Sequence, residues 1–125
     1  MPVVAAVILR GSRYLLGRRP AHKRHGALWE FPGGKVREGE SRLEATRREL
    51  AEELDVAVLS LGDLLLSVHD EGSSFVIEFF STVTEGIPVA REHSEVSWFT
   101  FDELLGLELA PADARFVAHL ARSPR

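Results

Sequence analysis

The amino-acid sequence predicts an α/β (α+β) fold in which a mixed β-sheet is sandwiched between α-helices. Short apolar segments with strand composition recur along the chain, and helical periodicity occurs between and after them. The length of 125 residues suits one compact domain. Because no repeat, low-complexity tract or linker interrupts the chain, we expect a single domain over residues 1–125.

The first part of the chain is expected to hold strands and a basic loop. Val3–Leu9 is an apolar run with β-branched residues, and Arg13–Gly17 resumes the strand pattern after a glycine turn. The polar and basic residues 18–26 predict a loop. Leu28–Phe31 is a short strand, which the strong breaker Pro32-Gly33-Gly34 is expected to end.

The clearest element is a helix over Ser41–Leu54. Ser41, followed three residues later by Glu44, forms a capping box, which satisfies otherwise orphaned amides at a helix start. An apolar stripe at helical spacing consists of Leu43, Leu50 and Leu54. This stripe predicts the side of the helix that faces the core.

The second part of the chain predicts further strands and two helices. The expected strands are Val58–His69, Phe75–Thr84 and Val96–Phe99, the first two joined by a turn at Asp70-Glu71-Gly72. The expected helices are Phe101–Leu105 and Ala112–Ala121. The last helix would direct inward the side chains of Phe116, Val117 and Leu120.

Composition excludes several classes of site and partner. With 15 Lys and Arg against 19 Asp and Glu, the net charge of −4 argues against nucleic-acid polymers as partners. The absence of Cys excludes disulfides, Cys-ligated zinc, iron–sulfur clusters and thiol nucleophiles. No apolar run approaches the ~20 residues of a membrane span, and the first residues lack a secretory pattern. We therefore expect a cytoplasmic protein with no membrane partner.

Carboxylates on the expected helix carry the first chemical signal. Glu49, Glu52 and Glu53 stand at i, i+3 and i+4, so they share one face. They repel each other unless a cation lies between them, and oxygen-only ligands favour Mg²⁺ or Mn²⁺. A solvated acidic surface is the alternative interpretation. Arg48 beside them either holds a carboxylate in one rotamer or forms a weak surface ion pair.

Together with the glycines upstream, these residues resemble the signature of the Nudix hydrolases. Gly34 is followed after five residues by Glu40, and after seven more by the run Arg48-Glu49-Leu50-Ala51-Glu52-Glu53. Asp55 stands where the family usually has Gly, a departure expected to affect helix termination more than chemistry. The segment Leu28-Trp29-Glu30-Phe31-Pro32-Gly33-Gly34-Lys35 further resembles the MutT branch. The resemblance implies the Nudix fold and a single Nudix hydrolase domain.

The resemblance also implies a set of site residues around Mg²⁺, with Mn²⁺ as a substitute. The catalytic residues would be Glu49, Glu52, Glu53 and Arg48. The role of Arg48 would be to orient Glu49. The metal ligands would be the backbone carbonyl near Gly33 and the side chains of Glu49, Glu52, Glu53 and Glu92. Gly34 and Glu40 would support the site. Glu95 is the alternative to Glu92, and a solvated loop carboxylate is the alternative interpretation of Glu92 itself.

Basic residues are expected to bind the phosphate chain. The resemblance assigns this role to Arg19 and Arg24, whose guanidinium forks match phosphate oxygens, and Lys35 is expected to bind phosphate with them. Solvated surface charge is the alternative for the basic loop. His22 and His25 in that loop are expected to be bystanders.

Asp113 is the candidate reader of the nucleobase. It follows Pro111-Ala112, where the MutT type that reads 8-oxoguanine presents Asn. An ionised Asp only accepts hydrogen bonds, so it would suit the cytosine amino group or the extra ring N–H of 8-oxoguanine. The alternative interpretation is a helix N-cap.

The sequence thus predicts a Mg²⁺-dependent nucleoside triphosphate pyrophosphohydrolase of the MutT type. It would release a nucleoside monophosphate and pyrophosphate, with 8-oxo-dGTP as the favoured substrate. One alternative is an enzyme specific for cytidine nucleotides, and another is a Nudix module that binds nucleotides without cleaving them. The expected partner is a small nucleotide, and the chain is expected to be a monomer or a homodimer.

Overall fold

The computed structural model describes residues 1–70 and 72–122. A 7-stranded sheet has its main path in the order β3 (Trp29–Glu30), β2 (Arg13–Arg18), β1 (Pro2–Arg10), β6 (Val76–Glu85), β5 (Ala57–His69). Off this path, β4 (Gly33–Lys35) pairs with β1, and β7 (Glu95–Thr100) pairs with β2. β1 and β6 run parallel and the other pairs are antiparallel. The sheet is therefore mixed, as predicted.

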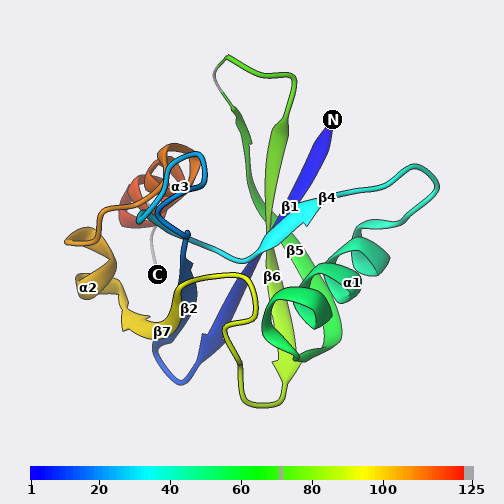
Figure 1. Ribbon diagram of the computed structural model, residues 1–125, viewed down its shortest axis with the longest axis horizontal. Coiled ribbons are helices and arrows are strands. Elements are labelled where there is room, and N and C mark those ends of the chain that lie inside the picture. Colours follow the sequence, from blue (N-terminus) through cyan, green and yellow to red (C-terminus); the bar gives the residue numbers. More distant parts are fainter. Residues whose placement is uncertain (71, 123–125) are drawn as a thin grey trace.

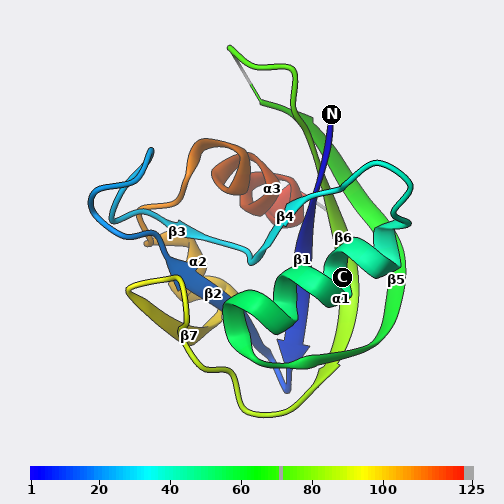
Figure 2. The ribbon, with the colours of Figure 1, turned by 45° about the vertical axis from the view of Figure 1, so that its right-hand side comes forward.

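Helices cover both faces of the sheet. α1 (Arg42–Leu54) lies on one side of β1, and α2 (Phe101–Leu105) and α3 (Pro111–Arg122) lie on the other (Figures 1 and 2). β1 contributes side chains to a hydrophobic core on each face of the sheet. Ala6 and Ile8 pack on the α1 side, and Ala5 and Val7 pack on the α3 side. A strand buried on both faces needs a continuous apolar run, which is what its sequence supplies.

The capping box predicted at Ser41 forms. Ser41 Oγ accepts a hydrogen bond from the Glu44 backbone N–H at 3.0 Å, and the Glu44 carboxylate accepts one from the Ser41 N–H at 2.8 Å. The same capping box, made by Thr100 and Glu103, begins α2. Of the residues predicted to point inward from α3, Phe116 and Val117 are buried, and Leu120 is partly buried against the same core cluster.

The short strand β3 ends before Pro32, as predicted, but the two glycines that follow begin a further strand, which the sequence did not predict. Gly33–Lys35 forms β4, which pairs with Val3–Ala5 of β1. The predicted turn at 70–72 includes Glu71, which lies outside the described residues. Within the described residues, no helix is long and apolar enough to cross a membrane.

Candidate active site

Arg48 links two carboxylates and a strand. Its guanidinium donates hydrogen bonds to Glu40 at 2.7 and 2.9 Å and to Glu49 at 2.7 Å. Another, at 2.9 Å, goes to the backbone carbonyl of Lys35 on β4. Hydrogen bonds from Arg48 and from the Arg37 backbone lower the pKa of Glu40 to about 2. Glu40 therefore anchors Arg48, and Arg48 fixes the rotamer of Glu49.

Two glycines of β4 allow this strand to pass beneath the helix. A Cβ at Gly34 would collide with the carboxyl group of Glu49, and a Cβ at Gly33 would collide with the carbonyl oxygen of Val4 on β1. The backbone of β4 can approach the Glu49 carboxylate closely only because side chains are absent at these positions.

Glu53 is a buried carboxyl group among other carboxylates. Only 7% of its side chain is exposed, and its Oε2 has no hydrogen-bond partner within the described part of the chain. Burial, followed by the charges of Glu49, Glu30 and Glu92, raises the pKa of Glu53 to about 9. A divalent cation would relieve the same repulsion, so the unpartnered oxygen and the carboxylate donors fit a metal ion.

A cavity of about 170 Å³ brings these groups together. Its acidic lining consists of Glu30, Glu49, Glu53 and Glu92. Glu52 is half-exposed at the outer side of the cluster, 3.9 Å from Arg48 Nη1. Glu95 instead lies on β7, 3.3 Å from Arg18 Nη1. The structure therefore brings Glu92 to the cavity and leaves Glu95 outside it.

Sequence reasoning assigned no role to Glu30 or His93, which complete this cavity. His93 Nε2 lies 2.9 Å from one carboxylate oxygen of Glu30, and Arg19 Nη1 donates to the other at 2.9 Å. Burial would raise the pKa of Glu30, but His93 and Arg19 outweigh it and lower that pKa. A glutamate between Trp29 and Phe31, inside a short strand, was the available signal.

The predicted phosphate-binding residues lie at different places along the cleft. Arg19 lines the acidic cavity, whereas Arg24 lies farther out and pairs with Asp70 at 3.7 Å. Lys23, another basic residue of the same loop, lines the acidic cavity. Lys35 Nζ lies 4.8 Å from the centroid of the Phe75 ring.

Asp113 lies at the other end of the cleft. It lines a cavity of about 250 Å³, whose apolar wall includes Val3, Phe75 and Ile77. Asp113 Oδ1 accepts a hydrogen bond from the backbone N–H of Phe31 at 2.8 Å. Burial raises the pKa of Asp113 to about 8.

The N-cap interpretation of Asp113 is wrong. α3 begins at Pro111, and the carbonyl of Ala110 accepts the first helical hydrogen bond, from Ala114. Asp113 is therefore inside the first turn. Its carboxyl group joins α3 to the end of β3 instead of closing its own helix.

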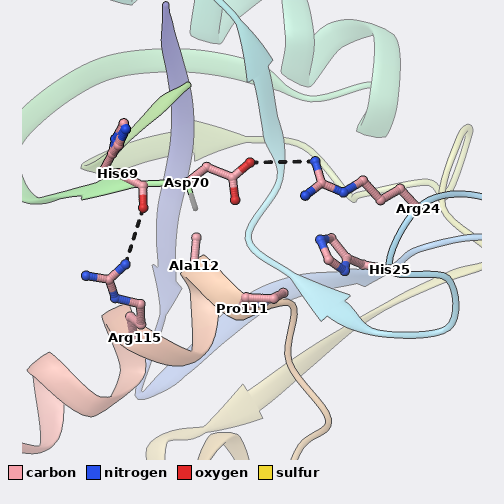
Figure 3. A pocket seen from close by; sticks show the side chains of 7 residues that line it. All are labelled: Arg24, His25, His69, Asp70, Pro111, Ala112 and Arg115. Atoms are coloured by element: carbon pink, nitrogen blue, oxygen red, sulfur yellow. Dashed lines mark hydrogen bonds and ion pairs between the residues drawn. The ribbon is translucent and has the colours of Figure 1, made fainter. Parts of the chain in front are cut away.

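Figure 3 shows the residues that line an outer cavity of about 430 Å³. This cavity and the one at Asp113 share Arg24, His25, Asp70, Pro111 and Ala112. Arg115 borders the outer cavity and donates a hydrogen bond to the His69 carbonyl at 3.2 Å. The cleft therefore runs from an acidic end, past Asp113, to a rim with cationic side chains.

A protein-family model matches nearly the whole chain. The model of the NUDIX domain matches residues 1–120. The chain belongs to the Nudix family. It is accordingly a hydrolase of phosphoric anhydride bonds in a small nucleotide, and Nudix hydrolases generally use divalent metals.

Several Nudix relatives are similar over most of their length. "Putative 8-oxo-dGTP diphosphatase 2" of Mycobacterium tuberculosis is 39% identical over 97% of this chain and 88% of its own. "CTP pyrophosphohydrolase" of Escherichia coli is 40% identical over 89% and 84%. The crystal structure of a MutT NUDIX hydrolase from Burkholderia pseudomallei has a TM-score of 0.83 and 30% identity over 94% and 95%. The E. coli ORF135 solution structure has a TM-score of 0.80 and 36% identity over 99% and 94%.

The departure from the Nudix signature at Asp55 lies where α1 ends. Asp55 adopts the left-handed conformation, with φ 57° and ψ 37°, and its N–H bonds the Ala51 carbonyl. Arg91 Nη2 lies 3.1 Å from its carboxylate. The residue that replaces glycine thus terminates the helix, as expected, and lies away from the acidic cavity.

Proposed function

We propose that this Nudix protein is a Mg²⁺-dependent nucleoside triphosphate pyrophosphohydrolase of the MutT type, with residues 1–125 as a single domain. It would convert (d)NTPs to a nucleoside monophosphate and pyrophosphate. The observation that carries the proposal is the pair of helix carboxylates in one cavity: Glu49, held by Arg48, and Glu53, buried with an unpartnered oxygen. Phosphoryl transfer needs chiefly this positioning and charge neutralisation.

In this proposal the acidic cavity holds the metal. The ligands would be the Gly33 carbonyl and the carboxylates of Glu49, Glu52, Glu53 and Glu92. When bound, Mg²⁺, or Mn²⁺ in its place, supplies neutralisation of phosphate charge and a more acidic bound water. Arg48 holds the Glu49 carboxylate in place, so Glu49 would face such a water, and Gly34 leaves open the space in front of Glu49.

The phosphate chain would extend from the acidic cavity along the basic side chains. Arg19, Arg24 and Lys35 remain the proposed phosphate contacts, with Lys23 added by its place in the cavity wall. Arg19 already donates to Glu30, which orients its guanidinium within the cavity.

The base would lie against Asp113. With its pKa at about 8, Asp113 is mostly protonated at neutral pH, so it presents both a donor and an acceptor, as Asn does. This supports an oxidised purine such as 8-oxo-dGTP, in line with relatives bearing that name. The second candidate is a cytidine nucleotide, favoured by the 40% identity to a protein named CTP pyrophosphohydrolase.

The biological role would be sanitation of the nucleotide pool, which protects DNA in the manner of a repair function, in the cytoplasm. The proposed partner is a free nucleotide, with no nucleic-acid polymer and no membrane, and the chain would act as a monomer or homodimer. A non-catalytic binding module is disfavoured because the carboxylates Glu49 and Glu53 are both present and line one cavity.

A nucleotide panel with product analysis tests this proposal. The purified protein with Mg²⁺ is incubated with 8-oxo-dGTP, dGTP, dCTP, CTP, 5-methyl-dCTP, ADP-ribose and diadenosine tetraphosphate, and kcat/KM is compared. We expect a triphosphate to give the highest value, with pyrophosphate as product. A preference for ADP-ribose would overturn the MutT assignment, and binding without turnover would establish the module instead.

A further inference from the structure

Glu30, Glu53 and His93 converge from three separate segments of the fold. Each offers a donor atom, and these atoms lie within 4.8 Å of one another. Glu30 is on β3, Glu53 on α1, and His93 in the segment before β7. Both buried side-chain polar atoms that lack a hydrogen-bond partner among the described residues, Glu53 Oε2 and His93 Nδ1, belong to this group. Glu53 Oε2 is therefore available to a ligand, whereas His93 would bind through Nε2, the ring nitrogen that faces Glu30 and Glu53.

The fold makes a specific place for the imidazole. Gly17 lies on β2 and pairs with Glu30 on β3. A Cβ at Gly17 would lie 2.5 Å from the His93 ring, so the ring occupies the space that a side chain would fill. Only 3% of the His93 side chain is exposed. His93 is thus a fixed part of the cavity wall rather than a mobile surface group.

The distances suit a bound cation. His93 Nε2 is 2.9 Å from Glu30 Oε2 and 3.7 Å from Glu53 Oε1. Metal–ligand distances of about 2.0–2.2 Å place neighbouring donor atoms roughly 3 to 3.5 Å apart. Arg19 bonds the other oxygen of Glu30, so it orients this carboxylate and leaves Oε2 toward the group. The 170 Å³ cavity, which these residues line, gives an ion access from solvent.

We propose that Glu30, Glu53 and His93 form a second cation site, separate from the all-oxygen magnesium site and sharing Glu53 with it. An imidazole nitrogen with two carboxylates favours a first-row transition ion, and Zn²⁺ or Co²⁺ binds such donors more tightly than Mg²⁺ does. The carboxylates of Glu49 and Glu92 add negative charge to the same cavity, whereas Arg19 and Lys23 oppose it. Cation binding at this site does not require nucleotide hydrolysis.

Metal binding to the metal-free protein tests this site directly. Zn²⁺ alone and Mg²⁺ alone are titrated by calorimetry into wild type, His93→Gln and, as the matched control, His22→Gln in the exposed loop. We expect His93→Gln to weaken Zn²⁺ binding by at least about tenfold, and by more than it weakens Mg²⁺ binding. His22→Gln is expected to match wild type. Equal Zn²⁺ affinity in wild type and His93→Gln would overturn the site.

A second measurement needs no substitution in the cavity. The ¹⁵N resonances of the histidine side chains are followed in the wild-type protein during Zn²⁺ addition. We expect a large shift of His93 Nε2 and little change at His22. Zn²⁺ binding with an unmoved His93 resonance would contradict the proposal, even if His93→Gln failed to fold.

The two proposals can fail separately. Hydrolysis of a nucleoside triphosphate with Mg²⁺ is measured on the same wild-type preparation. Turnover with no His93 shift would refute the second cation site and leave the pyrophosphohydrolase intact. A His93 shift without turnover on the nucleotide panel would support the cation site and refute the proposed function.

Discussion

The two ends of the cleft each contain a buried acid, but the acids differ in what surrounds them. Glu53 lies among the carboxylates Glu49, Glu30 and Glu92, and its pKa rises to about 9. Asp113 lies against an apolar wall, accepts a backbone hydrogen bond from Phe31, and its pKa rises to about 8. Burial is the largest cause at both ends.

This difference in surroundings indicates which ligand each end of the cleft is suited to bind. At Glu53 the remaining cause is like-charge repulsion, which a cation would remove, so this end is suited to bind a metal and through it a phosphate chain. At Asp113 the repelling carboxylate is Glu30, the Phe31 N–H opposes its effect, and a proton satisfies the acid. A protonated carboxyl group can both donate and accept, so this end can distinguish bases.

The largest expected effect is at the acidic end. Glu53→Gln should lower Mg²⁺-dependent kcat/KM by about a thousandfold, equivalent to roughly 4 kcal/mol of lost transition-state stabilisation. In metal-free buffer at pH 8 the same variant should unfold at a higher Tm. The contribution of wild-type Glu53 to the free energy of unfolding is full below about pH 4.5 and is lost as the pH rises through about 9. A glutamine at this position does not ionise, so its contribution does not change with pH. Undiminished turnover would remove Glu53 from the metal site.

A matched variant controls for the loss of one negative charge. Glu38→Gln, at an exposed position outside the cavity, should leave both kcat/KM and Tm close to wild type. If it lowered kcat/KM as much as Glu53→Gln, net charge rather than the cavity would explain the effect.

The next effect sharpens the role of the strand beneath the helix. Gly34→Ala should lower kcat/KM by about a hundredfold, because its Cβ displaces the Glu49 carboxyl group. Gly106→Ala, where the nearest neighbouring atom is 3.8 Å away, is the control and should retain activity. Calorimetric Mg²⁺ affinity should fall for Gly34→Ala alone; unchanged affinity and activity would show that Glu49 does not need its observed position.

A smaller effect is expected at Asp113, where the free energy of unfolding should depend on pH. The folded protein holds the Asp113 proton up to about pH 8, so its contribution to stability is full below about pH 3.8 and is lost as pH rises through 8. Asp113→Asn keeps an acceptor for the Phe31 N–H but cannot ionise. Urea unfolding at pH 5, 7 and 9 should therefore show wild type losing a few kcal/mol relative to Asp113→Asn. Parallel curves for the two proteins would mean that Asp113 titrates normally.

The smallest expected effect lies outside both ends. Asp55→Gly should raise the free energy of unfolding by up to about 1 kcal/mol, since glycine adopts the left-handed conformation without strain. Loss of the exposed Arg91 pair offsets part of this gain. Asp55→Ala should instead be less stable than wild type, and kcat/KM should change in neither variant. Equal stability of the Gly and Ala variants would contradict the conformational explanation.

Local signals in the sequence predicted much of this architecture. The capping box at Ser41 and the leucine stripe located α1, because caps and periodicity depend on residues a few positions apart. The spacing of Glu49 and Glu53 placed both on one helix face for the same reason.

Features that depend on distant residues were not predictable in this way. β4 is a strand only because β1 supplies its partner, although its glycines resemble a breaker. Glu30 and His93 meet across 63 positions of sequence, and no local pattern joins them. Asp113 bonds Phe31, 82 positions away, and no local pattern joins these two residues.

The most direct test compares substrate ranking in three proteins. Wild type, Glu53→Gln and Asp113→Asn are assayed with Mg²⁺ at pH 7 and pH 9 over the same nucleoside triphosphates, and kcat/KM is measured for each. If the acidic end handles only the phosphate chain and the other end selects the base, Glu53→Gln lowers every value by a similar factor. Asp113→Asn then changes the ratios between bases and reduces their dependence on pH. A uniform loss in Asp113→Asn, or a changed ranking in Glu53→Gln, would contradict this division of the cleft.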